Sequence, residues 1–147
     1  RQEMDVHDGI DAALALLESE VRDRIRIVRE YGELPLVDCC PGEINQVFMS
    51  LLSNAIEAIK DDGIITIRTL MENGDIRIAV SDTGAGIPPE RIPHLFDPGF
   101  STKGPRVKAG MGLLVSSNIV SKHGGRIDVA STPGEGSTFT VVLPRAA

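Results

Sequence analysis

The sequence has 147 residues, 41% of them hydrophobic, which is enough for one domain with a buried core. Its formal net charge of −6 and its lack of tryptophan argue against a nucleic-acid-binding surface, which needs clustered cations or stacking rings. No apolar run approaches the ~20 residues that a helix needs to span a bilayer.

The first half of the chain alternates between helical and extended patterns. Apolar residues at helical spacing predict an amphipathic helix over residues 8–22, with Asp8 as its N-cap. Strands are predicted over residues 24–31 and 36–39. A proline and a glycine then open a long helix with an apolar stripe, which we expect to cover residues 41–60.

Two adjacent cysteines, Cys39 and Cys40, end the second of these strands. Neighbouring cysteines rarely reach disulfide geometry, and no second cysteine pair exists to complete a metal site. We therefore interpret both as small packing residues in a reducing compartment.

Asn54 lies on the flank of the apolar stripe of the long helix. A polar side chain in this place is usually a satisfied group at a helix edge. Its amide oxygen can also ligate a hard cation. The spacing of the residues leaves both interpretations open.

A β-hairpin is predicted next, with strands over residues 64–71 and 76–80 joined through Asn73 and Gly74. Its second strand leads into the most informative motif of the chain.

Asp82 stands at the end of that strand and is followed by Gly84, Gly86, Ile87 and Pro88. A buried carboxylate there can accept a hydrogen bond from the amino group of a base, and the glycines can let a flat ligand lie against bare backbone. The motif alone is weak evidence, because turns after strands often contain Asp and Gly.

Residues 88–109 lack periodicity and are predicted to form a long loop, which in a compact domain is usually functional or disordered. Charge is uneven here, since residues 98–126 contain no acidic side chain. Five of the 15 basic residues lie in that stretch: Lys103, Arg106, Lys108, Lys122 and Arg126. A local positive field on an acidic protein favours an anionic ligand over a merely solvated loop.

Gly110, Met111 and Gly112 precede a helix predicted over residues 112–123. The free N–H groups of a helix start suit a phosphate, but a plain turn explains the glycines about equally well. Strands at residues 126–130 and 137–143 would follow. Together the elements predict one α+β domain, a two-layer sandwich with helices on one face of the sheet.

Three features thus suit the three parts of a magnesium–nucleotide complex. The carboxylate at a strand end suits a base, the amide on a helix flank suits a metal ion, and the basic, glycine-rich loop suits a polyphosphate. Periodicity and spacing lead no further.

The order of these motifs resembles the ATP-binding domain of sensor histidine kinases, in the GHKL ATPase/kinase superfamily. Nearly the whole chain is covered. The N box, first glycine box, F box, second glycine box and two closing segments correspond, in that order, to residues 46–59, 82–86, 95–103, 110–113, 119–125 and 136–139.

This resemblance implies the Bergerat fold, a mixed sheet with helices on one face, and the cofactors ATP and Mg²⁺. It implies that Asp82 accepts a hydrogen bond from the adenine amino group, with Thr138 assisting through water, and that Asn54 ligates Mg²⁺. Residues 96–109 would form a lid with Lys103 near the phosphates. The remaining nucleotide-binding residues would be Gly84, Gly86, Ile87, Gly110, Met111, Gly112 and Leu113.

The resemblance also implies an activity. The chain would be the catalytic half of a kinase, itself cytoplasmic and without membrane contact. It would be a fragment of a longer protein that is either soluble or anchored in a membrane. It would transfer the γ-phosphoryl group of ATP to a histidine on a separate dimerisation domain, and the phosphate would pass to a response regulator. Without that acceptor domain it would not autophosphorylate, since His7 lies in the domain's own first helix.

Three positions depart from the family pattern. Ser50 replaces a second asparagine of the kinases, or the glutamate base of related ATPases; Glu57 replaces a lysine, and Lys108 replaces a glycine. A serine accepts a proton from water poorly, which argues against efficient intrinsic hydrolysis. Two alternatives remain: a non-catalytic nucleotide-binding module, and a GHKL ATPase of the chaperone or repair kind.

Overall fold

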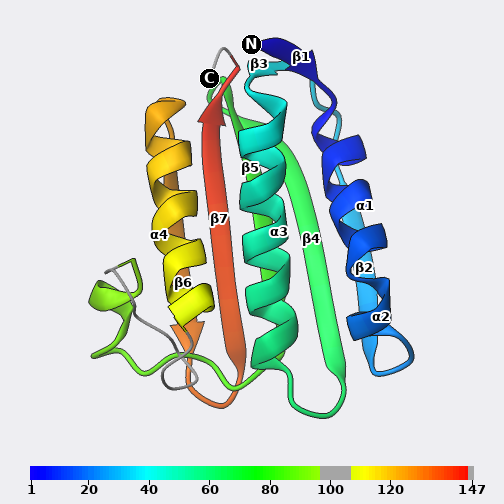
Figure 1. Ribbon diagram of the computed structural model, residues 1–147, viewed down its shortest axis with the longest axis vertical. Helices are drawn as coiled ribbons and strands as arrows, with labels where there is room; N and C mark the ends of the chain where they lie inside the picture. The colour runs from blue at the N-terminus through cyan, green and yellow to red at the C-terminus, as the bar shows by residue number, and fades with distance from the viewer. Residues whose placement is uncertain (97–106, 146–147) are drawn as a thin grey trace.

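A five-stranded sheet forms one layer of the protein and the long helices form the other (Figure 1). The computed structural model describes the backbone of residues 1–96 and 107–145, and the side chains of residues 1–96 and 112–145. The described elements are, in chain order, β1 (Gln2–Met4), α1 (Val6–Leu16), α2 (Glu18–Val21), β2 (Ile25–Tyr31), β3 (Val37–Cys39), α3 (Pro41–Ala58), β4 (Gly63–Glu72), β5 (Asp75–Asp82), the 3₁₀ turn η1 (Ile92–His94), α4 (Val107–Lys122), β6 (Arg126–Thr132) and β7 (Gly136–Pro144).

The large sheet has the strand order β2-β4-β5-β7-β6 and is mixed. β2 pairs parallel with β4, and the other neighbours are antiparallel. The predicted hairpin between β4 and β5 is present, with Asn73 and Gly74 at φ 55° and 84° as a tight turn requires. The fold class predicted from the sequence is therefore confirmed.

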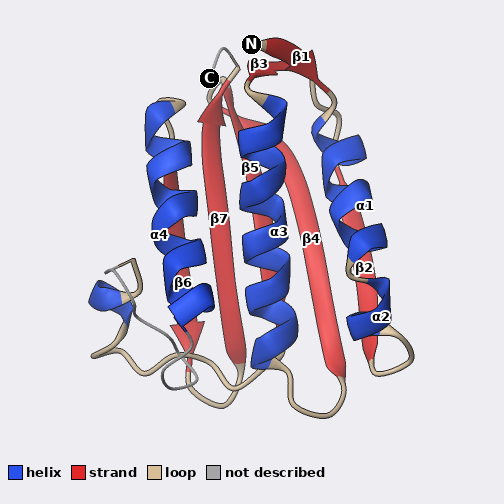
Figure 2. Cartoon of the chain, viewed as in Figure 1, coloured by secondary structure: helices blue, strands red, loops and turns tan. Residues whose placement is uncertain are grey.

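The helices α1, α3 and α4 cover one face of the sheet (Figure 2). Alternate residues of the central strands point into this layer, and Ile65, Ile67, Ile76 and Ile78 are fully buried there. α3 lies over the middle of the sheet and contributes its apolar stripe, as its periodicity predicted. No helix among the described residues is long and apolar enough to cross a membrane.

Some boundaries differ from the sequence prediction. The first helix stops at Leu16, and a separate short helix, α2, follows. β1 and β3 form a small antiparallel pair, of which the sequence predicted only β3. A three-residue strand such as β1 is too short to show a period. α4 begins at Val107 rather than near residue 112.

The N-cap of α1 is Asp5, not Asp8 as predicted. The Asp5 carboxylate accepts hydrogen bonds from the N–H groups of His7 and Asp8, at 2.9 and 3.3 Å. We expect Asp5→Ala to lower the free energy of unfolding by about 1 kcal/mol, because two helix N–H groups lose their acceptor. Asp8→Ala is the matched control and should cost less than half as much. Equal costs in urea denaturation would contradict this assignment of the cap.

Candidate functional site

Asp82 ends β5 in the middle of the sheet, between Ile65 of β4 and Ser137 of β7. Only 6% of its surface is exposed. Its Oδ1 atom accepts a 2.8 Å hydrogen bond from the N–H of Gly84, which fixes the carboxylate at the strand end. A buried, anchored carboxylate of this kind is suited to accept from a neutral donor on a ligand.

The glycines after Asp82 fasten the following loop to two other parts of the fold. A Cβ at Gly84 would stand 2.4 Å from the carbonyl oxygen of Ala58, the last residue of α3. Gly86 has φ +76°, and a Cβ there would stand 2.2 Å from the carbonyl oxygen of Thr132. The space that each glycine leaves open is thus filled by the protein's own backbone. The sequence-based reason for these glycines, room for a flat ligand, is therefore wrong.

Thr138 does not lie beside Asp82, contrary to the sequence-based expectation. Successive residues of a strand face opposite sides of the sheet, and the residue paired with Asp82 is Ser137. Thr138 pairs with Ser81, and their hydroxyl oxygens are 2.8 Å apart on the face away from the helices. Ser137 is buried, so it is the hydroxyl residue on the same face as Asp82.

Ser137 belongs to a small hydroxyl network. Its Oγ atom lies 2.8 Å from that of Ser131, which also donates to the Gly136 carbonyl and accepts from the N–H of Ile87. The network ties the loop after Asp82 to the β6–β7 turn. Sequence reasoning missed Ser137, and the strand register is the signal that identifies it.

Asn54 lies on α3, partly exposed, one turn after Ser50. Ser50 marks the α4 side of this helix, because its hydroxyl donates to the Gly112 carbonyl at 3.4 Å. A Cβ at Gly112 would meet the same hydroxyl at 3.0 Å. The end of α3 then reaches Gly84, so Asn54 lies between the contact with α4 and the loop that follows Asp82.

The other predicted site residues fall into three groups. Ile87 and Leu113 are 4% and 3% exposed and belong to the hydrophobic core. Gly110 and Met111 lie within the first turns of α4, which begins earlier than expected, so the glycine motif is part of the helix and does not precede it. Lys103 and most of the predicted lid lie outside the described residues.

Two histidines outside this region have packing roles. His7 stacks on Tyr31 with ring centroids 4.1 Å apart, and its Nε2 lies 2.7 Å from the Thr69 hydroxyl. Burial and a hydrogen bond to Asp11 raise the pKa of the Tyr31 phenol. His123 is buried at the end of α4. Both side chains are therefore held in place by contacts within the fold.

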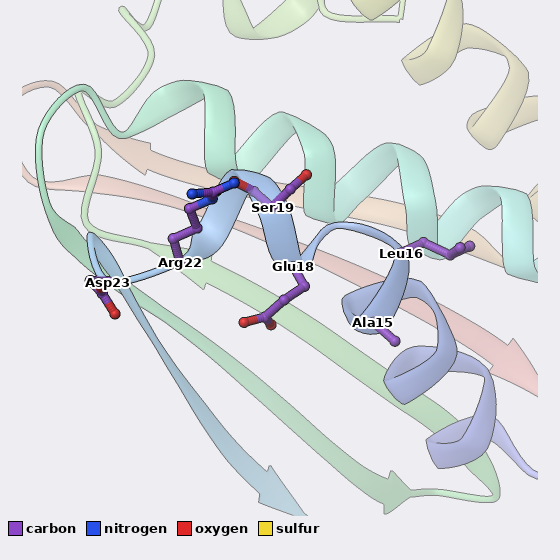
Figure 3. A pocket seen from close by; sticks show the side chains of 6 residues that line it. All are labelled: Ala15, Leu16, Glu18, Ser19, Arg22 and Asp23. Carbon is purple, nitrogen blue, oxygen red and sulfur yellow. The ribbon is translucent and has the colours of Figure 1, made fainter.

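A surface pocket lies around α2 at the sheet edge formed by β2, two strands away from β5 and Asp82 (Figure 3). Its lining residues are Ala15, Leu16, Glu18, Ser19, Arg22 and Asp23. None of them is a predicted site residue. The candidate site is therefore the Asp82 end of the sheet together with the facing parts of α3 and α4.

A mixed sheet of this order, covered on one face by helices, defines an α+β domain of the kind found in histidine kinase catalytic domains. The chain belongs to the histidine kinase-, DNA gyrase B- and HSP90-like ATPase family, whose model matches residues 41–147.

Solved structures support the same assignment. The catalytic domain of histidine kinase ThkA is 30% identical, with a TM-score of 0.87, and the match covers 99% of this chain and 98% of that one. A second structure, of histidine kinase ThkA in complex with response regulator protein TrrA, has a TM-score of 0.83 and 28% identity, and covers 99% of this chain and 42% of that one.

Curated relatives are longer proteins. The sensor histidine kinase ZraS of Escherichia coli K12 is 37% identical over 97% of this chain, which spans 31% of that protein. The sensory histidine kinase/phosphatase NtrB of Salmonella typhimurium is 34% identical over 95% of this chain, which spans 42% of it. The chain thus spans about a third of the length of the curated relatives it matches.

Proposed function

We propose that residues 1–147 are the ATP-binding catalytic domain of a sensor histidine kinase, within a longer protein. The observation that carries the proposal is Asp82, buried and anchored at the end of β5 with Ser137 on the same face. That pair presents a carboxylate and a hydroxyl at the end of the family's characteristic sheet. The family assignment supports ATP as the nucleotide that they receive.

The described residues fit a magnesium–adenine nucleotide. The Asp82 carboxylate would accept a hydrogen bond from the base amino group, and Ser137 would assist in place of Thr138. Asn54 would offer an amide oxygen, a hard ligand of the kind that Mg²⁺ prefers. When bound, the ion would offset charge on the transferred phosphoryl group, and the chain would then chiefly position the reactants.

Of the three histidines, His94 lies in η1, and the other two are held by the fold in ways that favour an acceptor outside this domain. His7 is held by Tyr31 and Thr69, and His123 is buried between α3 and α4, so neither is placed to attack a phosphate at the Asp82 end. The phosphoryl group would go to a ring nitrogen of a histidine on a dimerisation domain of the same parent, as the P–O bond to ADP breaks. A response regulator would take it from there, on the cytoplasmic side of the membrane.

Ser50 argues against an independent ATPase. Its hydroxyl donates to the Gly112 carbonyl and has a weakly basic oxygen, so it is a poor base for activating water. We expect hydrolysis by the isolated chain to be slow for that reason.

The test is transfer in trans. The 147-residue chain, mixed with a separately produced dimerisation domain of its parent and with γ-labelled ATP and Mg²⁺, should give an acid-labile, base-stable phosphohistidine. The chain alone should incorporate no label. Nucleotide binding without any transfer would favour a non-catalytic module, whereas rapid phosphate release by the chain alone would favour an ATPase.

A further inference from the structure

We propose that Cys40, Glu43 and His123 form a binding site for a transition-metal ion of the zinc class. One ligand atom from each of these side chains lies within 4.8 Å of the other two. The three residues come from the start of α3 and the end of α4, which meet at the opposite end of the helical layer from Asp82 (Figure 1). The site is therefore separate from the proposed nucleotide site.

His123 is already in the form that a metal binds. Its Nδ1 atom lies 2.8 Å from the Ile119 carbonyl oxygen, and its Nε2 atom accepts a 3.2 Å hydrogen bond from the N–H of Cys40. Both contacts require the neutral ring with its proton on Nδ1, so the lone pair of Nε2 is directed at the backbone N–H of Cys40. Metal-binding histidines are usually fixed by such a bond from the other ring nitrogen to a carbonyl.

The approach of the other two ligands needs small movements. Zinc bonds of about 2.0–2.3 Å in a tetrahedron place ligand atoms roughly 3.3–3.8 Å apart. Ligand atoms that now lie up to 4.8 Å apart would therefore close by about 1–1.5 Å. Glu43 shares its carboxylate with Lys122 at 3.2 Å, but the Lys122 side chain is 67% exposed, and such a surface pair is weak. The long bond from the Cys40 N–H to Nε2 would be exchanged for the metal bond.

The ligand types select the metal. A thiolate with an imidazole and one carboxylate suits Zn²⁺, whereas Mg²⁺ prefers oxygen ligands alone. Three protein ligands leave a fourth position for water. A bound ion would fasten the start of α3 to the end of α4, the two helices that carry Asn54 and Gly112.

The adjacent cysteines supply a matched pair of variants. Cys39 is fully buried and lies 3.7 Å from the Met4 sulfur, outside the cluster, whereas Cys40 is partly exposed within it. Cys40→Ala should weaken zinc binding by about 100-fold or more, since even changes around a metal's ligands cost 10–100-fold. Cys39→Ala should leave the affinity within about threefold of the parent chain.

Two further variants change the carboxylate without touching the buried histidine. Glu43→Gln should weaken binding by at least about 10-fold, because a charged ligand is lost. Lys122→Gln should tighten binding, by up to about fivefold, because it removes the cation that competes for Glu43. An increase in affinity of this kind is not expected of adventitious surface binding.

The experiment titrates the reduced, metal-free 147-residue chain with Zn²⁺ by calorimetry and with Co²⁺ by absorption spectroscopy. We expect one ion per chain, a thiolate-to-Co²⁺ charge-transfer band that Cys40→Ala abolishes, and a zinc-dependent rise in melting temperature. The proposal is overturned if no ion binds, if the band is missing, or if Cys39→Ala weakens binding as much as Cys40→Ala.

Discussion

Replacing Asp82 by asparagine should lower the affinity for ATP by about 100-fold, the largest loss of binding that we expect from a single isosteric change. The amide would turn a donor towards the amino group of the base, where the carboxylate accepts. A charged hydrogen bond is worth roughly 1.5–3 kcal/mol, and two facing donors add a penalty, which together correspond to this factor. Calorimetric titration with a non-hydrolysable ATP analogue and Mg²⁺ measures it.

The fold should survive this change, so the loss can be assigned to recognition. Asparagine keeps an oxygen that can accept the 2.8 Å bond from the Gly84 N–H. The matched control is Asp75→Asn, at the other end of the same strand, where the carboxylate is partly exposed. That variant should bind like the parent chain. Unchanged affinity in Asp82→Asn would refute the proposed role of the carboxylate.

The sequence predicted the sheet well because its strands carry their own signals. Alternating apolar residues located β2, β4, β5, β6 and β7 to within two residues. The turn between β4 and β5 was predicted from Asn73 and Gly74, which adopt the left-handed conformation such turns need. These signals are local, and a single sequence displays them directly.

Contacts between distant segments were not predictable in the same way. Ser137 and Thr138 are neighbours with similar side chains, and a shift of one residue in strand register exchanges the faces they occupy. Only the pairing of β5 with β7 decides which of them joins Asp82. Cys40 and His123, likewise, are 83 positions apart in the sequence and meet only because α3 and α4 pack together.

The predicted starts of two helices, α1 and α4, were wrong for local reasons. Asp5 and Asp8 are both plausible caps, and the choice depends on where the chain leaves β1. At α4 the glycines suggested a helix start, because glycine is a poor helix former. The helix instead begins before them, and the close approach of Gly112 to Ser50 gives a packing reason for the second glycine.

Gly136→Ala should cause the largest loss of stability, about 4 kcal/mol in the free energy of unfolding. Gly136 has φ +130°, and an added Cβ would lie 1.9 Å from the carbonyl oxygen of Asp82. Asp82 is paired with β7 and Gly136 is paired with Thr132 of β6, so neither backbone can move aside without disturbing a strand ladder. A left-handed conformation and a backbone clash are among the few causes of losses this large. Urea denaturation measures the cost.

Gly134→Ala separates the clash from the conformation. Gly134 lies in the same turn with φ +82°, but a Cβ there would meet nothing within 4 Å, so only the left-handed strain of about 1 kcal/mol remains. Because Gly136 abuts the Asp82 backbone, its variant should also lose nucleotide affinity at temperatures where it is still folded, whereas Gly134→Ala should not. Similar stabilities for the two variants would show that the backbone at the end of β5 can move to accommodate an added Cβ. Asp82 would then be less rigidly placed than the proposed recognition of adenine requires.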